Sequence, residues 1–213
     1  MKRMAAFRGK CPVRRAAPNR NPTVNWALHK ADLREDFNNH CGYCDSYDGY
    51  AHTYFEVDHF VPKDLIVKNR WPITLVQYSN LVYACKFCNN NKLANWPSNS
   101  YTVFHIGNKG FIDPCNKKYS THFYRRNNGE IMWNTRLGKW MYFNAFKFDE
   151  RNPGIKLLWN LNRLRKALDK LYEARKKNIK TSKKFKSIQA EINKISAQYY
   201  PAHTKLMEYY RNL

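Results

Sequence analysis

The sequence contains no long run of apolar residues. Its longest apolar stretches, within residues 65–67 and 73–76, are only a few residues long, whereas a helix that spans a bilayer needs roughly 20. This absence excludes a membrane-spanning helix. The basic N-terminal end also lacks the apolar stretch of a secretory signal, so we expect the protein in the reducing cytoplasm, with no membrane partner.

Acidic residues are scarce. The 213 residues include 38 Lys and Arg but only 16 Asp and Glu, which gives a formal net charge of +22. A surplus of this size favours a polyanionic partner such as nucleic acid. Hydrophobic residues, at 43% of the chain, and aromatic residues, at 15%, are plentiful enough for a folded core, which excludes a wholly disordered chain.

The positive charge is concentrated at the two ends of the chain. Residues 1–20 hold seven Lys or Arg and no acid, residues 21–150 hold 15 against 12 acids, and residues 151–213 hold 16 against four. We therefore predict a basic N-terminal arm, a compact central domain and a basic C-terminal helical region with these boundaries, the two basic parts binding phosphate. The alternative is that Lys-rich helices serve only solubility, although such helices usually mix both signs.

Local patterns predict both helices and strands in the central domain. Apolar residues at three-to-four spacing favour a helix over residues 22–38, and runs of β-forming residues favour strands. The predicted strands cover 54–60, 81–84, 101–106, 122–126, 130–134 and 140–148, and a short helix is predicted over 89–95. Asn127, Asn128 and Gly129 form a hairpin turn signal between two of these strands.

The C-terminal region has the pattern of two long helices. After a helix breaker at residues 152–154, leucines recur at helical spacing from 157 to 171, and apolar residues do so again from 185 to 199, with Pro201 starting or bending a last segment. We interpret the leucines as the core face of a helical hairpin. A dimerising coiled-coil seam is the alternative, but the leucines cover only about two heptads.

Six cysteines are present, and four of them form two Cys-x-x-Cys pairs separated by 40 residues: Cys41, Cys44, Cys85 and Cys88. Two such loops can place four thiolates around one Zn²⁺ ion, and four protein ligands leave no open position, so this zinc would be structural. Redox disulfides are the competing interpretation, which a reducing compartment disfavours. Cys11 and Cys115 are interpreted as bystanders, and His40 as a solvated residue that could alternatively replace a ligand.

Polar residues at fixed spacing accompany these cysteines. Residues 57–59 read Val-Asp-His and are followed by Val-Pro-Lys at 61–63; Asn80 precedes Leu81, and the second cysteine pair continues as Cys-Asn-x-x-Lys to position 92. With the two cysteine pairs, this series resembles the HNH endonucleases, the ββα-metal family in its zinc-stabilised bacterial form. The resemblance covers about residues 38–97, under a third of the chain.

The resemblance implies a catalytic role for four of these residues. His59 would be the general base that activates water, which suits a neutral imidazole near pH 7, and the Asn80 side chain would hold the loop that orients it. Asp58 and Asn89 would supply oxygen ligands to a catalytic Mg²⁺ or Mn²⁺ ion. Because the family often has His at the position of Asn89, and an amide is a weaker ligand, we expect a modest cation affinity.

Lys92 and Lys63 would contact nucleic-acid phosphate on the same resemblance. Lys92 lies about one helical turn after Asn89, and an ordinary surface lysine is the alternative interpretation for it. Each catalytic candidate also has a structural alternative, such as Asn89 acting as a helix N-cap. The occurrence of all of them at the family spacing, beside a predicted zinc site, favours the nuclease.

These observations together predict an α+β protein with a ββα-metal (HNH) nuclease core braced by a four-cysteine zinc site, accessory β-strands and a basic C-terminal helical region. We expect metal-dependent endonucleolytic cleavage of nucleic acid, with DNA favoured. The first alternative is a zinc-ribbon nucleic-acid-binding protein without catalysis. The second is an effector subunit that cuts only with a partner, as HNH proteins of this compact bacterial type do beside an ATPase in phage defence, with the leucine-faced helices as docking surface.

Overall fold

The structure is a computed structural model that describes residues 5–20 and 24–211. It mixes helices with small β-sheets, which confirms the predicted α+β class. The chain divides into two compact units. Unit 1 is formed by Met1–Arg126 and Glu130–Arg151, and unit 2 by Asn127–Gly129 and Asn152–Leu213.

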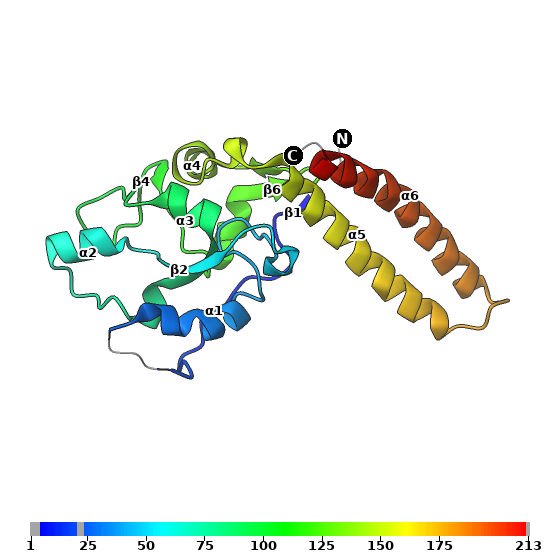
Figure 1. Ribbon diagram of the computed structural model, residues 1–213, viewed down its shortest axis with the longest axis horizontal. Helices are drawn as coiled ribbons and strands as arrows, with labels where there is room; N and C mark the ends of the chain where they lie inside the picture. The colour runs from blue at the N-terminus through cyan, green and yellow to red at the C-terminus, as the bar shows by residue number, and fades with distance from the viewer. Residues whose placement is uncertain (1–4, 21–23, 212–213) are drawn as a thin grey trace. The chain divides into compact units, whose positions relative to one another are not determined.

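The centre of unit 1 is a two-stranded sheet followed directly by a helix. Strand β2 (Phe55–His59) pairs antiparallel with β3 (Leu81–Cys85), and α3 (Lys86–Lys92) begins at the next residue (Figure 1). Both strands were predicted from their β-forming residues, and both are confirmed. Helix α3 begins and ends three residues earlier than the prediction of 89–95, because Leu93 has φ = 46°, a left-handed conformation that stops the helix.

Of two further helices of unit 1, one precedes this centre in the sequence and the other lies between its two strands. The helix predicted over residues 22–38 is a 3₁₀ turn (Trp26–His29) that continues as α1 (Lys30–Asp36). The Asn25 side chain accepts a hydrogen bond from the Ala27 N–H and begins this turn; residues 22 and 23 lie outside the described part. Helix α2 (Lys63–Asn69) was not predicted, because only seven residues separate Pro62 from the left-handed Arg70.

A second sheet has the order β1-β6-β7, with β1 (Ala5–Ala6), β6 (Phe123–Arg125) and β7 (Ile131–Trp133). The hairpin predicted around Asn127-Asn128-Gly129 is confirmed, since β6 and β7 pair antiparallel on either side of it. Of the strand predicted over 101–106, only the last two residues form β4 (His105–Ile106), which pairs with β5 (Lys109–Gly110).

The strand predicted over residues 140–148 is wrong. Helix α4 (Arg136–Trp140) passes into a π-helical turn (Met141–Ala145) and then a 3₁₀ turn (Phe148–Glu150). The apolar residues are buried at helical rather than alternating spacing, at Leu137, Met141, Tyr142, Ala145 and Phe146. Tertiary packing therefore decides this segment against its local preference.

The N-terminal arm is not a free phosphate-binding segment. Arg14 pairs with Asp113 at 2.9 Å, and Arg15 pairs with carboxylates around α1 at 2.8–2.9 Å. Arg8 is buried and donates a hydrogen bond to the carbonyl oxygen of Pro114 at 2.8 Å. Arg14 and Arg15 thus hold the arm to acidic residues, and Arg8 holds it to a backbone carbonyl, so these three arginines are engaged within unit 1 rather than free to bind phosphate.

Unit 2 is a hairpin of two long helices, α5 (Pro153–Lys176) and α6 (Lys183–Arg211), which lie side by side (Figure 1). Both predicted helices are confirmed. Leu161 and Leu164 are buried and the other leucines of the series, at 157, 168 and 171, are half-buried. Helix α6 continues through Pro201 instead of ending there. Within the described residues, no helix is long and apolar enough to cross a membrane.

Candidate active site and metal centre

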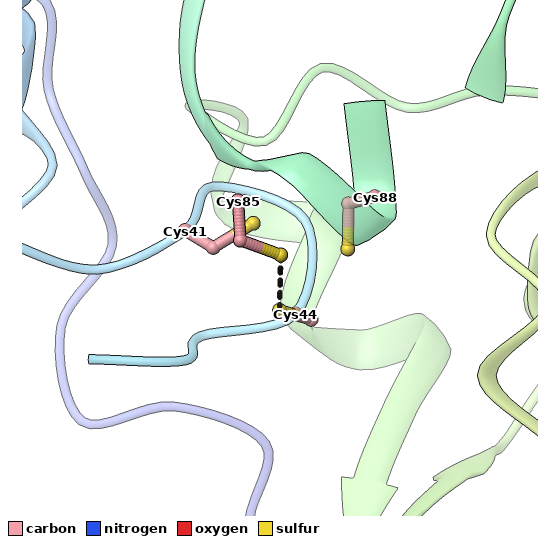
Figure 2. A group of neighbouring side chains, drawn as sticks. All are labelled: Cys41, Cys44, Cys85 and Cys88. Atoms are coloured by element: carbon pink, nitrogen blue, oxygen red, sulfur yellow. Dashed lines mark hydrogen bonds between the residues drawn. The ribbon is translucent and has the colours of Figure 1, made fainter. Parts of the chain in front are cut away.

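The four predicted zinc ligands lie together in unit 1. Their sulfur atoms are all within 4.8 Å of one another, and all four side chains are buried (Figure 2). The Sγ atoms of Cys44 and Cys85 are 3.8 Å apart. A tetrahedron with Zn–S bonds of about 2.3 Å has edges of about 3.8 Å, so this donor set fits a closed zinc site.

The two bystander cysteines and His40 are not members of this cluster. Cys11 Sγ contacts the carbonyl oxygen of Cys115 at 3.5 Å, and His40 Nδ1 bonds the carbonyl oxygen of Asn38 at 2.5 Å. Within residues 5–20 and 24–211, the four cysteines are the only group of three or more His, Cys, Asp and Glu side chains close enough to share an ion.

Arg151 places a positive charge against the cysteine cluster. Its guanidinium donates to Cys85 Sγ at 3.7 Å and to Cys88 Sγ at 3.8 Å. Burial by itself would lower the pKa of Arg151, but the surrounding cysteine sulfurs raise it above its ordinary value. Four thiolates around Zn²⁺ carry surplus negative charge, so a buried guanidinium is the expected outer partner of such a site.

Three of the four catalytic candidates, Asp58, His59 and Asn89, share one cavity of about 370 Å³, whereas Asn80 is not part of its lining. Its lining combines the end of β2, the start of α2, the end of α3 and one aromatic residue of the preceding 3₁₀ turn. The polar and charged lining residues include Asp58, His59, Lys63, Asp64 and Asn89, and Trp26 is the aromatic one. The structure therefore brings together the predicted site residues Asp58, His59, Lys63 and Asn89, which lie up to 31 positions apart in the sequence.

The ring of His59 is held in one orientation. Its Nε2 atom lies 2.8 Å from the carbonyl oxygen of Leu75, and its ring meets Trp26 edge-on at 5.0 Å. A carbonyl oxygen can only accept, so Nε2 carries the proton and Nδ1 keeps its lone pair. Burial lowers the pKa of His59, outweighing the Leu75 bond and Asp58, which raise it. The imidazole is thus neutral and basic at Nδ1 near pH 7.

The carboxylate of Asp58 is almost buried and has two donors. Tyr43 donates its hydroxyl to Oδ2 at 2.5 Å, and the Lys92 ammonium lies 3.1 Å from the same oxygen. Burial and the neighbouring Asp58 raise the pKa of Tyr43, so its hydroxyl keeps the proton that it donates. Lys92 also donates to the carbonyl oxygen of His59 at 2.7 Å.

Lys92 does not occupy the position that the sequence predicted for it. Its side chain has 0% exposure, and its ammonium faces Asp58 rather than solvent. A direct phosphate contact by Lys92 therefore does not fit this structure. Lys63, in contrast, is exposed at the cavity, with its ammonium 5.5 Å from the Trp26 ring centre, and its phosphate contact stays a prediction.

Two amide side chains complete the site. The carboxamide of Asn80 accepts from the Val61 N–H at 2.8 Å and donates to the Val61 carbonyl oxygen at 3.2 Å, which closes the loop after His59. Asn89 donates its Nδ2 to Glu56 Oε2 at 2.7 Å. The Nδ2 atom is thereby engaged, and the Oδ1 atom is the end of the amide suited to a cation.

Sequence reasoning missed several residues around the cavity. Glu56 could have been found, because residues two apart on a strand share a face and Glu56 precedes Asp58 by two. The contributions of Tyr43, Trp26 and the Leu75 carbonyl had no local signal, since each depends on how distant segments pack. The catalytic roles of the residues that were predicted stay predictions.

Comparison with known proteins agrees with this geometry. The family model for the HNH endonuclease matches residues 41–94. The chain is 40% identical over 63 residues to the Septu protein PtuB of Bacillus thuringiensis. That match covers 30% of this chain and 23% of the relative, so it spans about a quarter of the relative's length. A search of solved structures found no significant match.

The matched segment contains the whole cysteine cluster, both strands of the central sheet and α3. It is also the segment on which the sequence pattern resembled this family. The chain therefore contains an HNH endonuclease domain at residues 41–94.

Proposed function

We propose that the protein is a metal-dependent endonuclease that hydrolyses phosphodiester bonds, with DNA as its substrate. One observation carries this proposal: His59, with Nδ1 left basic, lines the same cavity as Asp58 and Asn89 within an HNH endonuclease domain. The four-cysteine cluster, which fits a zinc ion, lies apart from that cavity and would brace the fold.

The residues of the cavity divide the chemistry between them. His59 takes the proton of the attacking water at Nδ1, while Leu75 holds the opposite nitrogen. Asp58 and Asn89 would hold Mg²⁺ or Mn²⁺, which when bound neutralises charge on the phosphate and on the departing oxygen. Asn80 keeps the loop after His59 in place, and Lys63 faces the incoming phosphate.

Unit 2 supplies the electrostatic attraction for nucleic acid. Residues 175–186, at the turn between α5 and α6, hold seven Lys or Arg and no acid. The lysines at 177, 180, 183, 184 and 186 are all exposed. We propose that this cluster, the hairpin tip, contacts backbone phosphates, which adds affinity without sequence specificity.

For the biological setting we propose phage defence, with a protein partner such as an ATPase subunit. The sequence pattern implied this setting, and similarity to a Septu protein supports it over part of the domain. Co-purification from cells distinguishes an effector subunit from a free-standing enzyme, because only a subunit retains a stoichiometric partner.

Incubation of the purified chain with supercoiled plasmid in Mg²⁺, Mn²⁺ or EDTA tests the proposed activity. We expect nicked or linear product with either cation and none in EDTA or with His59→Ala. Parallel reactions with single-stranded DNA and RNA test the choice of substrate. Binding of DNA without any product, both by the chain alone and together with a co-purified partner, would instead identify a non-catalytic zinc-ribbon protein.

A further inference from the structure

The two cysteine pairs are each connected to the carboxylate of Asp58. Each Cys-x-x-Cys pair forms a short loop, here called a knuckle. Tyr43 lies inside the first knuckle, between Cys41 and Cys44, and its hydroxyl donates to Asp58. Lys92 lies four residues after Cys88 on α3, about one helical turn beyond the second knuckle. Its ammonium reaches the same carboxylate. Both knuckles of the zinc cluster thus deliver a donor to one predicted cation ligand.

Tyr43 is itself tightly held. It has 0% exposure, its ring packs against that of Phe146 at 4.7 Å, and its carbonyl oxygen accepts from the Tyr119 hydroxyl at 2.8 Å. The preceding Gly42 donates its N–H to the carbonyl oxygen of Tyr83 on β3. The hydroxyl of Tyr43 therefore has a position set by the knuckle and by the core around it.

The two donors leave Asp58 with one oxygen available. Oδ2 accepts both close bonds, at 2.5 Å from Tyr43 and 3.1 Å from Lys92, whereas among the described residues Oδ1 has only a contact of 3.5 Å with Lys92. A carboxylate offers about four lone-pair sites, so Oδ1 keeps the capacity to bind a cation. Carboxylates that bind metals are oriented by fixed hydrogen-bond partners of this kind.

We propose that Tyr43 is a positioning residue for the catalytic cation, and that through it the zinc knuckle determines how Asp58 is presented. By holding Oδ2, the hydroxyl fixes the rotation of the carboxylate and leaves Oδ1 as the atom that would bind the ion. The inference rests on the proposed function, since it takes Asp58 as a cation ligand. The two metals would then be coupled, because loss of zinc would release the knuckle that carries Tyr43.

The experiment measures Mn²⁺ binding by electron paramagnetic resonance, using zinc-loaded, full-length protein. Tyr43→Phe removes one oxygen atom and keeps the ring. We expect unchanged zinc content and Mn²⁺ affinity lower by about 10–100-fold, the usual effect of losing an outer partner of a metal ligand. Asp58→Asn identifies the binding event that belongs to this site. Unchanged affinity in Tyr43→Phe would overturn the proposal.

Tyr83→Phe is the matched control, because it deletes the hydroxyl of another buried tyrosine, which donates to the carboxylate of Asp48 and not to Asp58. We expect wild-type affinity. An equal loss in both variants would show a packing effect and would overturn the positioning role. If the wild-type protein cuts plasmid and binds Mn²⁺, and Tyr43→Phe binds Mn²⁺ with the same affinity, this inference alone is refuted. Wild-type protein that neither cuts nor binds Mn²⁺ refutes the proposed function as well.

A measurement on wild-type protein decides the matter if Tyr43→Phe fails to hold zinc. With carbon-13 at the Cζ atom of tyrosine, addition of Mg²⁺ should shift the nuclear magnetic resonance signal of Tyr43, because its hydroxyl bonds the ligand. The Tyr119 signal should stay in place. A Tyr43 signal that does not respond to Mg²⁺ at saturation would contradict the proposal.

Discussion

The Nε2 atom of His59 lies 2.8 Å from the carbonyl oxygen of Leu75, 16 positions along the chain. This one bond decides which nitrogen of the ring is basic, because the carbonyl oxygen requires a proton on Nε2. The loop that carries Leu75 therefore takes part in the predicted chemistry without contributing a side chain to it. The orientation of the ring leaves Nδ1 as the atom that can accept a proton from water.

The pH dependence of cleavage follows from this environment. Burial lowers the pKa of His59 below its usual value of about 6.5, so the imidazole is neutral at pH 7 and becomes protonated, and inactive as a base, only as the pH falls through the lowered pKa. We expect the single-turnover rate at saturating Mg²⁺ to rise with pH and to level off before pH 7. A midpoint of this rise above pH 7 would contradict the assignment. In His59→Ala the rate should fall by about 10²–10⁴ and the rise should disappear.

Lys92 is predicted to support the fold and the carboxylate rather than to bind phosphate. Lys92→Met removes the partner of an almost buried charge, so the free energy of unfolding should fall by about 3–5 kcal/mol. Chemical denaturation of the zinc-loaded protein measures this. Lys63→Met, at an exposed position, should change stability by about 0.5 kcal/mol or less but weaken DNA binding. If Lys92→Met kept wild-type stability but bound DNA more weakly, the result would favour a phosphate contact by Lys92 instead.

The cysteine cluster should hold one zinc ion per chain. Cys85→Ser removes a ligand at the end of β3, and the metal should be lost together with part of the folding free energy that its binding supplies. Elemental analysis and thermal melting measure the two effects. Cys115→Ser is the control, since this cysteine lies outside the cluster and should keep both zinc and melting temperature. Well-folded, reduced wild-type protein without zinc would disprove the site.

The hairpin tip should dominate the salt dependence of DNA binding. Exchange of three tip lysines for Gln, at 180, 183 and 184, should reduce the slope of log K against log salt by about 0.9 for each lost phosphate contact. A variant with the same charge change at Lys156, Lys170 and Lys205, elsewhere on α5 and α6, should reduce it less. Equal reductions in both variants would indicate a general charge effect, and no reduction would exclude contact by the tip.

Sequence alone was sufficient for the features that depend on local pattern. The β-forming residues before His59 and after Asn80 predicted β2 and β3, and the leucines after residue 157 predicted α5, because each pattern is read within a few turns or strand repeats. The spacing of the cysteines predicted the cluster that the structure forms. The same spacing, with the Asp-His pair, also predicted the HNH endonuclease domain.

Tertiary structure alone decided the features that depend on segments distant in the chain. Residues 140–148 became helical because their apolar side chains meet the core at helical spacing, and Arg14 and Arg15 turned inward because carboxylates of unit 1 lie within 3 Å of them. For the same reason, the ammonium of Lys92 pairs with Asp58 instead of facing solvent. The sequence shows where a charged residue or a run of aromatic residues occurs, but it does not show which partner will contact it in the folded protein. The fold supplies that partner, and burial makes the pairing strong.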